Sequence, residues 1–148
     1  MKKSSLLSFL TMSLFFFSCG EKAQTNTTNI ENSIEVTNRI EVIDFYGTHR
    51  CFTCEAIEAS AKYTVETYFA EEQKKGIVIF KTVNVDDDEN YKMAEAYEAT
   101  GTALFLNVVK NGKETHIDLT DFGFSKGTEQ EEFSKELKTK IETELKTL

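Results

Sequence analysis

Hydrophobic and polar positions change their spacing along residues 34–148, and these changes predict the first elements of a domain. The nearly continuous apolar run at 40–46 is typical of a central strand that is covered on both faces. From Phe52 to about Lys74, apolar residues recur every three or four positions, which predicts an amphipathic helix ended by Gly76. The buried side of this helix is expected to carry Cys54, Ile57, Ala61, Val65 and Tyr68.

The rest of the pattern predicts three further strands and two further helices. Strands are expected at 77–85, 102–109 and 115–119, and Asn111-Gly112 is a strong two-residue hairpin signal between the last two. The strand–helix–strand units predict parallel pairing with right-handed crossovers, and the hairpin adds an antiparallel edge. The order β-α-β-α-β-β-α therefore predicts an α/β domain, a small mixed sheet with helices on both faces.

The two later helices have weaker signals than the first. Acidic residues 86–89 lack the alternating spacing and the glycine of a calcium loop, so we interpret Asp86–Asp88 as helix-start residues. The short helix after them should carry Tyr91, Ala94 and Tyr97 on one face. The last helix is expected to begin at a capping box at 128–131 and to present Phe133, Leu137, Ile141 and Leu145.

The first 33 residues have a different character. Two lysines, an apolar run at 6–17 that is too short for a membrane span, and small residues around Cys19 are typical of a secretory signal. Ser18-Cys19-Gly20 resembles the lipobox of bacterial lipoproteins, which implies a signal peptide at 1–18 and lipidation of Cys19. A conventional signal peptide cut nearby is the alternative.

This N-terminal pattern predicts where the protein resides. The polar residues that follow Cys19, up to 33, are expected to form a flexible tether for the domain at 34–148. The predicted location is the bacterial cell envelope, lipid-anchored and facing the periplasm or the exterior. Several acyl chains give stable anchoring, whereas one chain alone is marginal.

Charge excludes some partners. The chain has 17 basic and 25 acidic residues, a net charge of −8, and removal of residues 1–18 takes away two lysines and gives −10. Such a balance argues against nucleic acid as a partner and against charge-driven docking on anionic lipid. The acidic residues are spread along the chain, which favours a solvated surface.

Cysteine provides the candidate chemistry. If Cys19 is lipidated, Cys51 and Cys54 are the remaining thiols, and they lie three positions apart at the start of the first helix. A disulfide closing a four-residue loop removes little chain entropy, so a structural bond is a poor explanation. The helix N-terminus favours a thiolate at Cys51, while Cys54 lies on the buried stripe.

The element order, with these cysteines opening the first helix, resembles thioredoxin over residues 34–148. Segments similar to that family's motifs are Asp44-Phe45-Tyr46, Val83-Asn84-Val85-Asp86, Gly101-Thr102-Ala103-Leu104 and Val109-Lys110-Asn111-Gly112-Lys113. The chain departs from the family in having His49-Arg50 before the first cysteine and Phe52-Thr53 between the two. It also contains no proline, so Thr102 or Ala103 replaces the family's cis-Pro and a trans peptide is expected there.

The resemblance implies thiol–disulfide exchange on protein substrates. In that scheme Cys51 is the nucleophile, Cys54 resolves the mixed disulfide, and Asp44 is the candidate proton acceptor, with a structural role as its alternative. The residues expected to tune this site are His49, Arg50, Phe52, Thr53, Thr102 and Ala103. Positive charge near Cys51 favours the thiolate, which predicts a potential above the ~ −270 mV of thioredoxin.

Several assignments keep a plainer alternative. His49 and Arg50 could equally be solvated loop residues, and His116 on the edge strand is interpreted as structural. Phe122 and Phe124, in a loop expected at 121–127, would line the groove or join the core.

Two other functions remain open at this stage. A binding module would hold Cu(I) or Zn(II) through the two cysteines and His49, and an adaptor would bind a partner protein without turnover. The enzymatic hypothesis needs no cofactor and no metal. Its expected partners are envelope proteins with thiols or disulfides and an unidentified redox partner, and the protein is expected to be a monomer.

Overall fold

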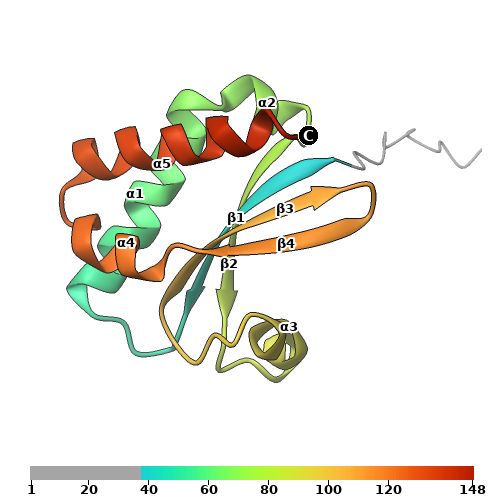
Figure 1. Cartoon of the computed structure of the whole chain (residues 1–148). Coiled ribbons are helices and arrows are strands. Elements are labelled where there is room, and N and C mark those ends of the chain that lie inside the picture. The colour runs from blue at the N-terminus through green and yellow to red at the C-terminus, as the bar shows by residue number, and fades with distance from the viewer. Residues whose placement is uncertain (1–37) are drawn as a thin grey trace, which may run out of the picture. The chain divides into compact units, whose positions relative to one another are not determined.

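The computed structural model describes residues 38–148, so the predicted signal peptide and tether lie outside the described residues. A four-stranded sheet with the order β2-β1-β3-β4 forms the centre of this unit (Figure 1). Its strands are β1 (Arg39–Tyr46), β2 (Val78–Asn84), β3 (Ala103–Lys110) and β4 (Lys113–Asp118). Within the described part, none of the helices has the length and apolar character needed to span a bilayer.

The sheet is mixed, as predicted, but one pairing direction differs. β1 and β2 are parallel, β3 and β4 form the Asn-Gly hairpin, and β3 runs antiparallel to β1. The prediction of parallel pairing was therefore wrong for the second strand–helix–strand unit. Its helix, α3 (Tyr91–Ala96), has only six residues and lies at one end of the sheet (Figure 1). The chain thus enters β3 at the end where it left β2.

Helices lie on both faces of the sheet, as predicted. α1 (Phe52–Tyr68) and α5 (Gln130–Leu145) cover one face together with the short α4 (Thr120–Lys126) (Figure 1). α3 lies at the end of the sheet, where its Met93 packs against the hydrophobic cluster of the other face. A 3-10 turn, Asp88–Asn90, precedes α3. The predicted first helix is broken at Phe69, and α2 (Ala70–Lys74) follows the break. Phe69 is buried whereas Tyr68 is exposed, because the break turns Phe69 into the core where Tyr68 was expected.

Alternation along β1 creates two hydrophobic clusters. Ile40 and Val42 pack against the helices of one face, together with the predicted stripe of α1 and the buried residues of α5. Ile43 and Phe45 point to the other face, where Phe45 contacts the rings of Tyr97 and Phe105. The central strand is consequently buried on both sides, as its continuous apolar run predicted.

Two local predictions near the C-terminus were wrong. Residues 120–126 form α4 instead of a loop, because Phe122 packs on Phe133 with ring centroids 4.8 Å apart. Phe122 thus joins the core, while Phe124 is exposed. The capping box does not form: the N-cap of α5 is Glu129, which makes no side-chain cap. The turn that joins Glu129 N–H to the carbonyl of Lys126 leaves Thr128 outside the helix.

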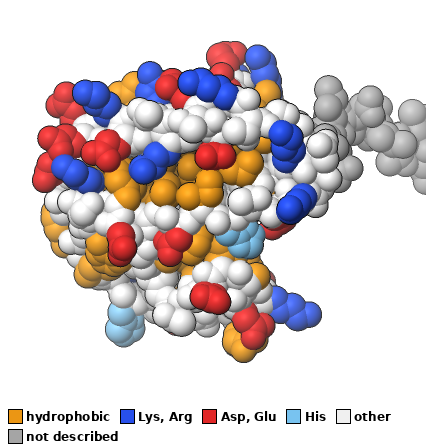
Figure 2. Space-filling view, in the orientation of Figure 1, with side chains coloured by type: hydrophobic (Ala, Val, Ile, Leu, Met, Phe, Trp, Pro, Cys, Tyr) orange, Lys and Arg blue, Asp and Glu red, His pale blue; other side chains and the backbone are white. Residues whose placement is uncertain are grey.

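The described surface carries charges of both signs. Figure 2 shows acidic and basic side chains interspersed over one face, with hydrophobic side chains between them. An ion pair of 2.6 Å joins Lys126 of α4 to Glu132 of α5, and one of 3.5 Å joins Lys138 to Glu142 within α5. The excess negative charge is therefore not gathered into one acidic field on the face shown.

Gly127→Ala is expected to destabilise the domain by about 1–3 kcal/mol. A Cβ atom at Gly127 would lie 2.5 Å from Ile57 Cγ1 and 2.7 Å from the backbone oxygen of Gly123, so α4 would have to move away from α1. The carbonyl of Gly127 also accepts a hydrogen bond from buried Ser60. Urea unfolding measures the change, with Gly101→Ala as the control because nothing lies within 4 Å of a Cβ there. Equal losses in both variants would contradict the packing argument.

Candidate thiol–disulfide site

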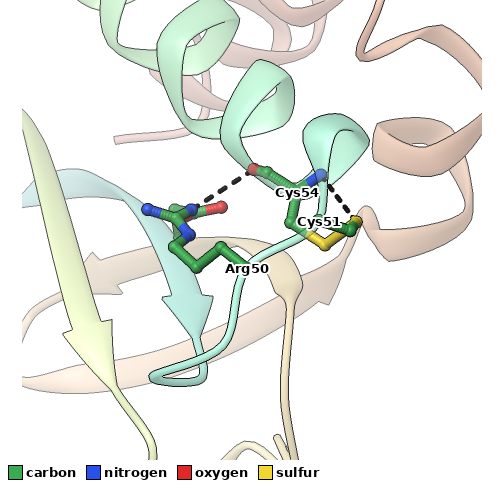
Figure 3. Close-up of a disulfide and its surroundings, with 4 residues drawn as sticks. Arg50, Cys51 and Cys54 are labelled. Carbon is green, nitrogen blue, oxygen red and sulfur yellow. Dashed lines mark hydrogen bonds and ion pairs between the residues drawn. A yellow bond between two sulfur atoms is a disulfide. The ribbon is translucent and has the colours of Figure 1, made fainter.

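Cys51 and Cys54 form a disulfide at the N-terminus of α1, with their Cα atoms 5.0 Å apart (Figure 3). Cys51 is the N-cap residue, in extended conformation, and its Sγ accepts a hydrogen bond of 3.1 Å from the backbone N–H of Cys54. The spacing of three residues places both sulfurs on one helical turn. The free N–H groups and the positive end of the helix therefore face the sulfur of Cys51.

The two cysteines differ in access. Cys51 is exposed, and Phe52 beside it is 78% exposed. Cys54 is 8% exposed and belongs to the buried stripe of α1, as its position in the sequence predicted. An incoming sulfur can therefore reach Cys51 from solvent, whereas Cys54 is accessible chiefly from within the site. This asymmetry is what a nucleophile and a resolving cysteine require.

Asp44 lies near the C-terminal end of β1 and is completely buried. Its Oδ2 is 3.2 Å from Arg50 Nη2, while its Oδ1 has no hydrogen-bond partner. Burial raises the pKa of Asp44 to about 7, and the nearby charge of Glu58 adds to this, although Arg50 acts in the opposite direction. A carboxyl with this pKa exchanges protons near neutral pH, as a general base must.

Arg50 is an internal partner of the site and not a solvated loop residue. Its guanidinium is ion-paired with Asp44 and with Glu58. Nη2 also donates a 3.2 Å hydrogen bond to the carbonyl of Cys54, and Figure 3 shows Arg50 directed toward that carbonyl. The guanidinium carbon lies 4.6 Å from the ring centroid of Tyr46. Two carboxylates offset its charge, so Arg50 adds less to a Cys51 thiolate than its place in the sequence suggested.

Glu58 is the site residue that the sequence analysis missed. It follows Cys54 by four positions and therefore lies on the same side of α1, next to the buried stripe. That spacing is the signal that would have found it. The spacing indicates a site residue only once Arg50 is known to contact Glu58, which lies eight positions later in the sequence.

Proteins similar to this chain are found among solved structures. No protein-family model matches it, and no curated protein matches it. Solved structures that are similar include thioredoxin from Fasciola hepatica, with 22% sequence identity and a TM-score of 0.36. The similarity covers 62% of this chain and 80% of that chain. The sheet order is β2-β1-β3-β4 with a single parallel pair, and a cysteine pair opens the first helix.

The described residues have a thioredoxin-like fold. In this thioredoxin-like domain, the loop before the cysteines is held by Asp86, which follows β2. The N–H of Thr48 donates a 2.6 Å hydrogen bond to Asp86 Oδ2, which lowers the pKa of Asp86, and the charge of the exposed His49 lowers it further. Asp86 thus orders the loop before the cysteines. Asp87 is the N-cap of the 3-10 turn and Asp88 is its first residue, so the predicted helix-start position is confirmed for these two, although Asp87 makes no side-chain cap. For Asp86 the prediction was wrong.

Thr102 directly precedes β3, and Ala103 is its first residue; these are the two residues that the sequence predicted to replace the family's cis-Pro. Every peptide bond from residue 38 to 148 is trans, as expected for this position without proline. Both residues line a surface pocket of about 730 Å³, together with Tyr97, Asp118 and neighbouring residues. Ala103 pairs with Phe45 of β1, so the segment is fixed by the sheet. Thr53, between the cysteines, is partly exposed on the first turn of α1.

His116 has a packing role, in keeping with its interpretation as structural. Its ring stacks on that of buried Tyr97 with centroids 3.7 Å apart, and burial raises the pKa of Tyr97. Among residues 38–148 there is no group of three or more His, Cys, Asp or Glu side chains placed to hold a metal ion.

Proposed function

We propose that this protein is a thiol–disulfide oxidoreductase that acts on protein thiols and disulfides. The observation that carries the proposal is the asymmetric disulfide: Cys51 is exposed at the helix N-terminus, and Cys54 is buried one turn behind it. A bond closing a four-residue loop adds little to stability, whereas this placement suits exchange chemistry. The thioredoxin-like fold is consistent with the same activity.

In the reducing direction, the thiolate of Cys51 attacks one sulfur of a substrate disulfide. The substrate S–S bond breaks, its leaving sulfur takes up a proton, and a mixed disulfide joins Cys51 to the substrate. Cys54 then loses its proton, for which Asp44 is the proposed acceptor, and attacks the sulfur of Cys51. The mixed disulfide breaks and the second substrate thiol leaves, so the substrate has gained two electrons and two protons. The reverse sequence oxidises a substrate dithiol.

The proposed setting is the bacterial cell envelope, with anchoring through lipidated Cys19. The charged start, the apolar run and the small residues around Cys19 support it. Envelope proteins and a redox partner would meet the domain at Cys51, where exposed Phe52 offers an apolar contact. The mass of the N-terminal peptide of the cell-derived protein tests this: an unmodified Cys19 would contradict anchoring.

A redox titration tests the activity. The full chain with Cys19→Ser is equilibrated in glutathione buffers, and the thiols of Cys51 and Cys54 are counted by alkylation. We expect a reversible two-electron couple between about −270 and −120 mV, because the N-terminus of α1 stabilises the thiolate of Cys51. A disulfide that resists reduction below about −300 mV would indicate a structural bond. A pair that oxidises only after chelation would support soft-metal binding instead.

A further inference from the structure

Arg50 joins three acceptors that come from different segments of the site. Its Nη2 lies 3.2 Å from Asp44 Oδ2. The same nitrogen lies 3.2 Å from the carbonyl oxygen of Cys54, the contact drawn in Figure 3. Its Nη1 is ion-paired with Glu58 of α1. Because a guanidinium is a planar fork, it holds these acceptors in one arrangement, which the single nitrogen of a lysine would not reproduce. Asp44 is thereby held beside the first turn of α1, which carries Cys54.

Two charges of opposite sign act on Asp44. Arg50, from the loop before α1, favours its carboxylate form, and Glu58, from α1, favours its protonated form. Glu55, also on α1, acts on Arg50, and the strand partners of Asp44 are the uncharged Thr82 and Leu104. The buried Oδ1 of Asp44 has no partner, which leaves it able to accept a proton.

We infer that Arg50 and Glu58 are positioning residues that set the pH at which Asp44 accepts the proton of Cys54. They would thereby set the pH dependence of the step in which Cys54 resolves a mixed disulfide. This inference rests on the proposed function. It goes further by assigning two residues, outside the cysteine pair, to the control of one step.

The resolving step is measured by reaction of the reduced full chain, carrying Cys19→Ser, with 5,5′-dithiobis(2-nitrobenzoate). Cys51 attacks this aryl disulfide and one thionitrobenzoate leaves. Cys54 gives its proton to Asp44 and attacks the sulfur of Cys51, so the second thionitrobenzoate leaves and the protein disulfide forms. Two protein thiols are oxidised, and the reagent is reduced to two thiolates. The rate of the second release is followed against pH.

Opposite shifts are expected for the two charge-neutralising variants. Arg50→Gln removes the positive charge, so the midpoint of the pH profile should rise by about one pH unit or more. Glu58→Gln removes the negative charge, so the midpoint should fall. Arg50→Lys should lie between the parent and Arg50→Gln, because it keeps the charge and loses the fork. In an Asp44→Asn background, Arg50→Gln should cause no further shift.

A merely structural role would slow the step without moving the midpoint in opposite directions. Midpoints that stay unchanged, or that move in the same direction in both variants, would overturn the inference. Glu58→Gln decides the matter alone if Arg50→Gln does not fold, because the side chain of Glu58 is 28% exposed and the change keeps its size. If the parent releases no first thionitrobenzoate, the proposed function itself fails, and that result is distinct from a normal first release with an unmoved second phase.

Discussion

Cys51→Ser is expected to abolish thiol–disulfide exchange, with a rate loss of at least about 10³-fold. A serine hydroxyl stays protonated at neutral pH and cannot form a disulfide, so both the nucleophile and the covalent intermediate are lost. Cys51 is also the exposed member of the pair, which leaves buried Cys54 poorly placed to replace it. The measurement is the reduction rate of a protein disulfide by the reduced full chain.

Cys54→Ala should behave differently, because it retains the attacking sulfur. It should complete the first half of the reaction and accumulate mixed disulfides through Cys51, which non-reducing electrophoresis and mass spectrometry detect. Cys19→Ser is the matched control, since Cys19 lies outside the described domain. Equal loss of the first step in the Cys51 and Cys54 variants would contradict the assigned roles. Unimpaired exchange by Cys51→Ser would contradict the mechanism as a whole.

Asp44→Asn is expected to become progressively more stabilising, relative to the parent, as pH rises from 4 to 8. Burial raises the folded-state pKa of Asp44 from 3.8 to about 7, so between these values the folded parent binds more protons than the unfolded chain. The parent's free energy of unfolding therefore falls as pH rises through this window. This difference between the folded and unfolded pKa of Asp44 changes the free energy of unfolding by at most about 4 kcal/mol. Asn does not titrate, so the variant lacks this dependence on pH.

Urea unfolding of the oxidised protein at several pH values measures the effect. At the acid end, the variant should show little advantage, because Asp44 is then protonated and uncharged in the parent. At pH 8, the parent holds a buried carboxylate that only Arg50 compensates, and the variant does not. Asp88→Asn is the control, because Asp88 is exposed. A constant difference between variant and parent across the pH range would show that Asp44 does not titrate in this window.

The element pattern could largely be predicted because it depends on local spacing. β1 is buried on both faces and therefore has a continuous apolar run, while α1 is buried on one face and has apolar residues every three or four positions from Cys54. Both patterns can be recognised in the sequence alone. The Asn111-Gly112 turn was similarly visible, since its backbone geometry requires those residue types, and both residues have positive φ. The weakest predictions were caps and short helices, whose signals tertiary contacts overrode at Phe69, Phe122 and Thr128.

Local sequence was enough to fix the strands, the hairpin and the place of Cys51 and Cys54 at the start of a helix, because each follows from neighbours within a few positions. Tertiary structure decided the direction of β3, since that depends on which end of the sheet the chain leaves after β2. It also decided that Arg50 turns inward to Asp44 and Glu58. A flexible side chain reaches any of several partners, and only the packing of β1 against α1 brings these two carboxylates together.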